Sequence, residues 1–202
     1  MLNNDQNEKH LMILFVLFIC VVTFMMSKEH FSNNSVLVTS NIDNTQYLVQ
    51  NLPDKQEAAN TIAIIRARIV KLLDYLNIHY AKDERTKRLN DRFDPNKIVE
   101  SGNDSKYTSY SINKGEKLVL CIRSRDEKNN IVDPNLLSFV ALHEISHICT
   151  ESVGHTEEFW DNFKWILTES IQCDCGIYMY EDYSKNPKKY CGMEVTDTPL
   201  TM

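Results

Sequence analysis

The segment from Val140 to Trp160 reads VALHEISHICTESVGHTEEFW and holds three of the six histidines in the chain. His143 and His147 are four residues apart, so on a helix both imidazoles leave the same face, one turn apart, and can bind one metal ion. On that helix Glu144 is turned by about 100° from His143, so its carboxylate can reach a water molecule on the ion without becoming a ligand. These residue types at this spacing indicate a hydrolytic zinc site.

The third zinc ligand must come from outside this pair, because a catalytic zinc ion takes three protein ligands and keeps one open position. His155 follows Gly154, whose backbone freedom helps to aim the side chain, and imidazole is a better zinc donor than carboxylate. We therefore expect Zn2+ to be bound by His143, His147 and His155. Five carboxylates remain alternatives for the third position: Glu151, Glu157, Glu158, Asp161 and Glu169.

Two helices are expected to position these side chains. Asp133 can cap a helix whose first turn suits Pro134, and no Gly or Pro interrupts residues 135–149. This helix should end near Thr150, and its apolar residues cover nearly every side, which is typical of a helix buried in a core. A second helix is expected over Glu157–Gly176, with its aromatic residues packing in the core rather than binding substrate.

The preceding elements support the metal helix. Residues Lys55–Tyr80 repeat apolar side chains at helical intervals and predict a long amphipathic helix. Tyr107–Ile112 and Lys117–Arg123 flank an Asn-Lys-Gly-Glu turn and predict a β-hairpin.

The second strand of this hairpin is the candidate for substrate binding. It directly precedes the metal helix, and a peptide can add to the free edge of such a strand through main-chain hydrogen bonds. We therefore expect Leu118, Val119 and Leu120 to contact a peptide substrate. An ordinary core strand is the alternative.

The N-terminal segment Leu11–Met26 reads LMILFVLFICVVTFMM, in which Thr23 is the one polar residue. It predicts a transmembrane anchor, although it is short of the roughly 20 residues that cross an average bilayer. A cleaved signal peptide and a buried helix are the alternatives, but no small-x-small cleavage site follows the segment. Lys9 and Lys28 lie on opposite sides of the segment, so the positive-inside rule leaves its orientation open.

Composition fits one globular domain: 202 residues, 43% of them hydrophobic and 25% charged. The net charge of −6 argues against general nucleic-acid binding, which needs a basic face, so no nucleic-acid partner is expected. The central segment is basic, and at helical spacing such residues usually form a solvated face. It contains Arg66, Arg68, Lys71, Lys82, Arg85, Lys87, Arg88 and Arg92.

Five cysteines lie outside the predicted anchor: Cys121, Cys149, Cys173, Cys175 and Cys191. Their odd number requires at least one free thiol if all bridges are internal. Cys173 and Cys175 are a weak candidate for a second zinc site. Buried thiols, or one bridge from this pair to Cys191, are favoured instead.

The predicted function is a zinc-dependent peptidase that hydrolyses a protein or peptide substrate. Glu144 acts as the general base on a water molecule whose pKa the zinc lowers towards ~7, and then returns the proton to the leaving amine. The alternative is a non-catalytic, zinc-stabilised structural or interaction protein, which needs the histidines but not the glutamate. Four tyrosines are candidates for stabilising the oxyanion: Tyr178, Tyr180, Tyr183 and Tyr190.

HEISH followed by GHTEEFW resembles the WLM and SprT-like zinc metallopeptidases, small zincins with a histidine shortly after the H-E-x-x-H helix. The resemblance implies a zincin-like fold, His143, His147 and His155 as zinc ligands and Glu144 as the base. It also suggests a protease that acts on DNA-bound proteins. The acidic net charge and the predicted anchor argue against that function.

A narrower resemblance spans Ser109 to Met193 and is carried by SYSINKGEKLVLCIRS, ALHEISH, GHTEEFW and NPKKYCGM. These segments resemble an uncharacterised group of membrane-anchored metallopeptidase-like proteins of large DNA viruses. The resemblance implies a single-pass protein of a virion or host-cell membrane, with membrane lipid as a partner of Leu11–Met26.

The expected fold is therefore α+β: a small zincin-like domain, with an antiparallel-edged sheet packed on helices, behind one transmembrane helix. The predicted segments are a tail over 1–10, an anchor over 11–27, a polar tether over 28–54 and the zincin-like domain over 55–202. Within the tether, a short strand is expected at Ser35–Thr39.

Overall fold

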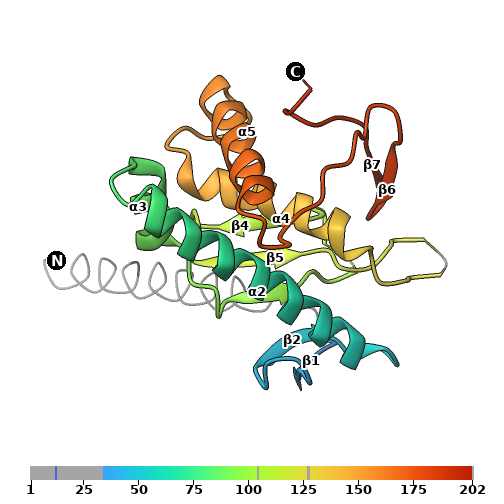
Figure 1. The fold of residues 1–202 in the computed structure, drawn as a ribbon. Helices are drawn as coiled ribbons and strands as arrows, with labels where there is room; N and C mark the ends of the chain where they lie inside the picture. The colour runs from blue at the N-terminus through green and yellow to red at the C-terminus, as the bar shows by residue number, and fades with distance from the viewer. Residues whose placement is uncertain (1–11, 13–33, 104, 127, 202) are drawn as a thin grey trace, which may run out of the picture. The chain divides into compact units, whose positions relative to one another are not determined.

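The computed structural model describes residue 12 and residues 34–103, 105–126 and 128–201 (Figure 1). Over these residues, no helix has both the length and the hydrophobicity that crossing a membrane requires. The predicted tail and the predicted anchor over 11–27 lie, apart from Met12, outside the described residues, so the anchor stays a prediction.

The described chain combines helices with small sheets, which confirms the α+β class. Its helices are α2 (Lys55–His79), α3 (Glu84–Arg92), α4 (Pro134–Cys149) and α5 (Glu157–Gln172). Its strands are β1 (Ser35–Thr39), β2 (Gln46–Gln50), β3 (Ile98–Glu100), β4 (Tyr110–Ile112), β5 (Lys117–Leu120), β6 (Lys188–Tyr190) and β7 (Met193–Val195). The predicted helix boundaries are right within a few residues for α2, α4 and α5.

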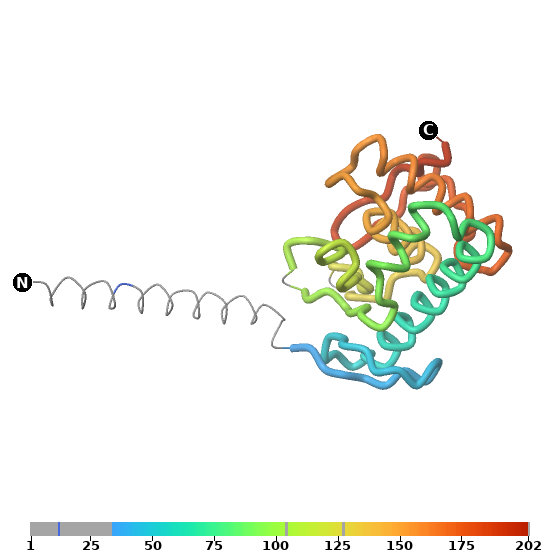
Figure 2. Tube along the Cα trace, turned by 90° about the vertical axis from the view of Figure 1, so that its left-hand side faces the viewer, coloured from blue at the N-terminus to red at the C-terminus, as the bar shows by residue number. Residues whose placement is uncertain are grey.

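The hairpin β1–β2 corrects the predicted tether. Strand Ser35–Thr39 is confirmed, but residues 34–54 belong to the folded unit, because β1 pairs antiparallel with β2. Tyr47 and Val49 point inwards from β2 and are almost fully buried. Figure 2 shows the hairpin beside the first turns of α2. The segment is polar in composition, but its two inward-facing apolar residues pack against α2, and this makes it part of the core.

The central sheet has the strand order β3-β5-β4. β3 runs parallel to β5, and β4 pairs antiparallel with it as the predicted hairpin. Strand β5 therefore has a neighbour on each side, and Leu118, Val119 and Leu120 are buried. The prediction that these three residues bind substrate is wrong, because their main-chain groups are already paired within the sheet. The edge strands of this sheet are β3 and β4.

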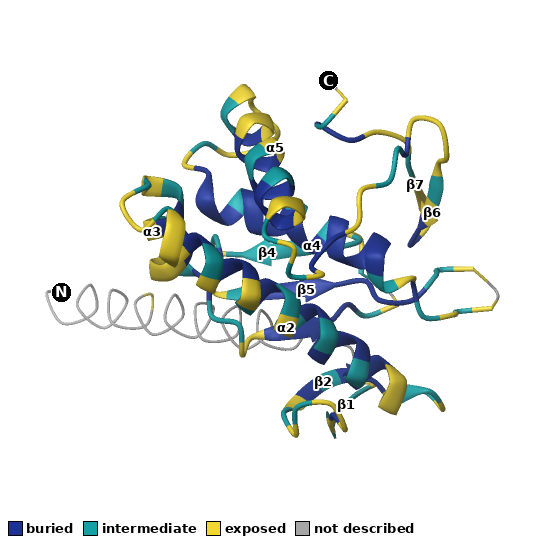
Figure 3. Cartoon of the chain, viewed as in Figure 1, coloured by how far each residue is buried: buried dark blue, intermediate teal, exposed yellow. Residues whose placement is uncertain are grey.

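Helix α4 lies at the centre of the core and packs against α2, α3 and α5. Figure 3 shows α4 and β5 as mostly buried. The apolar side chains of α4 are nearly inaccessible: Leu137, Phe139, Leu142, Ile145 and Ile148. The helix is thus held on most of its surface, which fixes the direction of its few polar side chains.

A disulfide joins Cys121, at the end of β5, to Cys191, in the turn between β6 and β7. The predicted bridge from Cys173 or Cys175 to Cys191 is wrong. Cys149, Cys173 and Cys175 carry free thiols, which confirms that at least one thiol is free. The hydroxyl of Tyr190 donates to the carbonyl of Cys121 at 2.8 Å, so the β6–β7 turn is held against β5 rather than against the end of α5.

A buried ionic cluster ties the first hairpin to the central sheet. The side chain of Arg123 is 2% exposed and contacts the carboxylates of Asp54 and of Glu100, the latter at 2.7 Å. The second oxygen of Glu100 accepts a hydrogen bond from the backbone N–H of Gln50 at 2.7 Å. One guanidinium therefore connects the end of β2, the start of α2 and the strands β3 and β5.

We expect Arg123→Ala to lower the free energy of unfolding by about 3–5 kcal/mol, because Glu100 is left as a buried, unpaired carboxylate. Urea denaturation of the full-length chain measures this change. Arg66→Ala is the matched control, since it removes a partly exposed ion pair of 3.8 Å with Asp43 and should cost about 1 kcal/mol or less. Equal losses in the two variants would contradict a structural role for the buried cluster.

Candidate metal centre

Helix α4 begins and ends where its capping residues predict. The carboxylate of Asp133 accepts hydrogen bonds from the backbone N–H groups of Asn135 and Leu136 at 2.9 and 3.1 Å, and Pro134 occupies the first turn. The helix ends at Cys149 and its C-cap, Thr150, has extended backbone angles. The chain then turns back through residues 151–156 into α5, which brings a third histidine to the first two.

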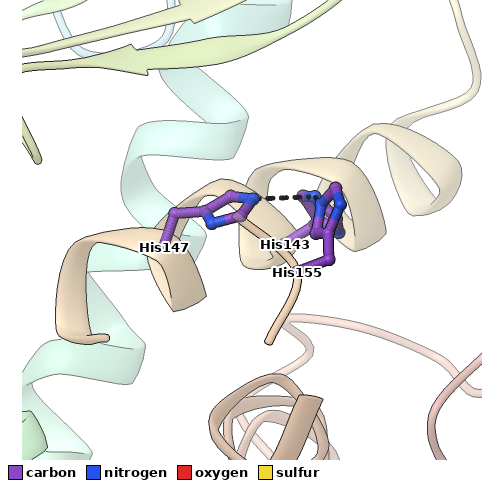
Figure 4. A group of neighbouring side chains, drawn as sticks. All are labelled: His143, His147 and His155. Carbon is purple, nitrogen blue, oxygen red and sulfur yellow. Dashed lines mark hydrogen bonds between the residues drawn. The ribbon is translucent and has the colours of Figure 1, made fainter. Parts of the chain in front are cut away.

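The three predicted ligands lie together (Figure 4). Nε2 of His143 is 3.2 Å from Nε2 of His147 and 3.1 Å from Nε2 of His155. One donor atom from each of the three lies within 4.8 Å of the others. Tetrahedral zinc with Zn–N bonds of 2.0–2.1 Å places its nitrogen ligands roughly 3.3–3.4 Å apart. The donor set and its spacing therefore fit a zinc ion.

Burial keeps the first two imidazoles neutral. The pKa of His143 falls to about 3, mainly through burial, with smaller effects from His147 and His155. The pKa of His147 falls to about 4, again mainly through burial, with smaller effects from His155 and Lys114. A neutral imidazole offers the lone pair that a metal ion binds, so both rings are in the ligating form at neutral pH.

Two of the five alternative third ligands have other partners. Glu158 accepts hydrogen bonds from the backbone N–H groups of Glu151 and Ser152 at 2.9 and 3.0 Å, which lower its pKa to about 2. Glu169 accepts a hydrogen bond from the hydroxyl of Tyr80 at 2.9 Å. Within the described ranges, the donors grouped tightly enough for a metal ion are the three histidines alone.

Glu144 lies beside the histidines on α4 and is 7% exposed. Burial raises its pKa to about 7, against the opposing effect of a hydrogen bond from the backbone of Ser111 in β4. A carboxyl group whose pKa lies near neutrality can both accept and return a proton at physiological pH. Glu144 thus has the surroundings of a general base, next to the histidines and facing the edge strand.

Two hollows meet at Glu144, and they share Thr108, His143, Glu144 and Met193. The larger has a volume of about 560 Å3 and follows residues 108–111, at the edge of the sheet, towards His155. This hollow could accommodate an extended chain alongside the free edge of β4.

The smaller hollow has a volume of about 270 Å3 and is mainly apolar. It is lined by Phe139, Val140, Trp160 and Phe163 of the two helices and by residues 193–199. Phe163 is almost fully buried, as predicted for a packing residue, but Trp160 is 36% exposed and lines the hollow. Its aromatic ring is therefore available to a ligand.

The four tyrosines proposed for the oxyanion line neither hollow. Tyr178 and Tyr183 pack on Phe139. Tyr190 is buried behind β4, where its hydroxyl lies 2.6 Å from the hydroxyl of Ser109.

Sequence reasoning missed Met193 and the 194–199 segment as parts of the site. The hairpin β6–β7 and the disulfide carry them there, so the Cys121–Cys191 pairing is the signal that would have identified them.

No family model matches the chain. The uncharacterized protein R325 of Acanthamoeba polyphaga mimivirus is 38% identical over 192 residues, which cover 93% of this chain and 95% of R325. The chain belongs to the family of R325. Two further relatives are similar to this R325-family chain over about half of their own length. They are the uncharacterized proteins 136R of Invertebrate iridescent virus 6, 34% identical over 84 residues, and 042R of Invertebrate iridescent virus 3, 34% identical over 86 residues. These matches cover 41% and 42% of this chain and 44% and 50% of the relatives.

The expectation of uncharacterised viral relatives is thereby confirmed. Among solved structures, Wss1 from Saccharomyces cerevisiae is similar over 62% of this R325-family chain and 86% of its own chain, with a TM-score of 0.48 and 18% identity. A Wss1 mutant gives a TM-score of 0.47 over 62% of this chain and 87% of its own. Likeness at this level carries no argument about activity, so membership of the WLM and SprT-like peptidases stays a prediction.

Proposed function

We propose that this protein is a zinc-dependent peptidase. The observation that supports this most is the grouping of His143, His147 and His155 beside the buried carboxylate of Glu144. Three imidazole ligands with an adjacent, non-ligating carboxylate are the arrangement of a hydrolytic zinc site. Zinc bound there would supply a Lewis acid and lower the pKa of a water molecule at its open position to about 7.

Within this proposal, Glu144 moves the proton. Its carboxylate accepts a proton from the attacking water and then donates it to the nitrogen of the leaving amine. The backbone N–H of Ser111 orients the carboxylate throughout. Burial raises the pKa of Glu144 to about 7, which makes the carboxylate a stronger base than one in solvent.

The substrate we propose is an extended peptide. Strand β4 lies at an edge of the central sheet, and its residues line the larger hollow, where a peptide can add as a further strand. Where the peptide passes Glu144, the smaller hollow would receive an apolar side chain against Trp160. The predicted anchor over 11–27 would place this activity at a membrane.

The alternative function is a non-catalytic module in which zinc holds α4 to the following loop. Such a module would explain the histidines but not Glu144. Burying a carboxylic acid is costly, and a structural zinc site gains nothing from one that is not a ligand. The burial of Glu144 at the junction of two hollows therefore favours the peptidase.

Removal of the metal tests the proposal. We expect the purified full-length chain to contain about one zinc ion by elemental analysis and to cleave an unbiased peptide library. A strong chelator should abolish cleavage, and stoichiometric Zn2+ should restore it whereas Mg2+, which prefers oxygen ligands, should not. Cleavage that persists in zinc-free protein would contradict the proposed function.

A further inference from the structure

The loop that carries His155 is held by one lysine. Nζ of Lys114, in the turn between β4 and β5, donates hydrogen bonds to the carbonyls of Thr150, Glu151 and Ser152 at 2.7, 2.8 and 2.7 Å. An ammonium group has three N–H donors, so these three carbonyls use all of them. Lys114 lines the larger hollow, yet it has no donor left for a substrate.

The end of α4 is held by two arginines of α3. Nη1 of Arg92 donates to the carbonyl of Ile148 at 3.0 Å, and Nε of Arg88 donates to the carbonyl of Cys149. Five successive carbonyls, over residues 148–152, thus accept hydrogen bonds from cationic side chains. Cations at this position also complement the negative end of the helix dipole.

An anion holds the same loop from its opposite side. The carboxylate of Glu158, in the first turn of α5, accepts hydrogen bonds from the N–H groups of Glu151 and Ser152. The hydroxyl of Ser152 also lies 2.6 Å from that of Thr156, the N-cap of α5. Both the carbonyl and the N–H groups of these two loop residues therefore have charged partners.

Lys114 is itself held in place. It adopts a left-handed backbone conformation with φ of 54°, and Gly115 follows with φ of 118°. A Cβ atom at position 115 would lie 2.6 Å from the carbonyl oxygen of Arg92 and 3.0 Å from Cγ2 of Ile148. The turn therefore packs directly on α3 and α4, and only glycine allows that approach.

We propose that Lys114 is a positioning residue for His155, which keeps the third imidazole beside the other two by fixing residues 150–152. His155 is exposed and comes from a loop, unlike the two histidines on α4. Its place 3.1 Å from His143 therefore depends on the loop backbone. The inference rests on the proposed zinc site. It assigns to Lys114 the contacts that hold the third ligand in position before the metal binds.

The zinc affinity of the full-length chain tests this role, measured by competition with a chromophoric chelator. We expect Lys114→Met to weaken affinity about 10–100-fold, since methionine has a similar length and donates no hydrogen bond. Lys114→Arg, which keeps the charge and donors, should recover part of the loss. Lys97→Met is the matched control, because Lys97 is 54% exposed and lies 3.8 Å from Asp94; it should change affinity by less than about twofold.

A double-mutant cycle separates positioning from general stability. In a His155→Ala background, Lys114→Met should change zinc affinity by less than about twofold, because the loop then carries no ligand. Unchanged affinity in the single variant, or equal losses in both backgrounds, would overturn the role of Lys114 while leaving the zinc site intact. If circular dichroism shows that Lys114→Met does not fold, Glu158→Gln takes its place in the cycle with the same criterion. A wild-type chain that binds no zinc would overturn the proposed function as well.

Discussion

Glu144→Gln is expected to reduce peptide hydrolysis by about 10²-fold or more while leaving zinc content and fold unchanged. The substitution keeps the size of the side chain, and an amide can still accept the hydrogen bond from the backbone of Ser111. It removes the one group beside the histidines whose pKa, at about 7, suits proton transfer at neutral pH. The chemistry should therefore fail at the proton transfer rather than at metal or substrate binding.

The measurement compares initial rates on a peptide library at equal zinc occupancy, determined by elemental analysis of both samples. Glu57→Gln is the matched control, because Glu57 is exposed on α2 and lines neither hollow. It should change the rate by less than about threefold, as expected for a surface carboxylate. Equal rates for wild type and Glu144→Gln would contradict a base role. No cleavage by either protein at full occupancy would favour the structural zinc module.

His143→Ala should abolish stoichiometric zinc binding. Nε2 of His143 lies within 3.2 Å of the Nε2 atoms of both other histidines. Its loss removes the central one of the three ligands. Structural zinc sites with four ligands bind with about 10–16 kcal/mol, which is roughly 10²–10³-fold in affinity for each ligand. We expect a loss of at least this size for His143→Ala and a similar one for His155→Ala.

Competition with a chelator measures these losses, and His79→Ala is the matched control. The imidazole of His79 packs on Tyr75 with a centroid distance of 4.4 Å and belongs to α2, outside the group of three donors. It should leave zinc affinity unchanged. If His155→Ala stays within a few-fold of wild type, a carboxylate serves as the third ligand. Glu158→Gln then becomes the next variant to measure.

The sequence by itself determined the features that depend on neighbours along the chain. A spacing of four residues places His143 and His147 on one face of any α-helix, and Asp133 caps that helix through backbone groups two and three residues away. His155 follows within eight residues of His147, so a short turn at Gly154, with φ of 86°, suffices to bring it back. Such contacts depend on local geometry, which residue types and spacing specify.

The tertiary structure alone decided which strand has a free edge. Strand β5 is a short apolar run after Lys117, and the parallel pairing of Ile98 with Leu118 is what places a second neighbour beside it. Such a pairing joins segments with no turn between them, so no local signal records it.

The remaining parts of the site were decided in the same way. The disulfide to Cys191 brings residues 193–199 over Glu144, and Lys114 meets the carbonyls of residues 150–152 across 36 to 38 positions of sequence. The basic stretch taken for a solvated face supplies Arg88 and Arg92 to the end of α4. Long side chains can reach either solvent or a distant backbone, and packing of the whole chain determines which of the two they contact.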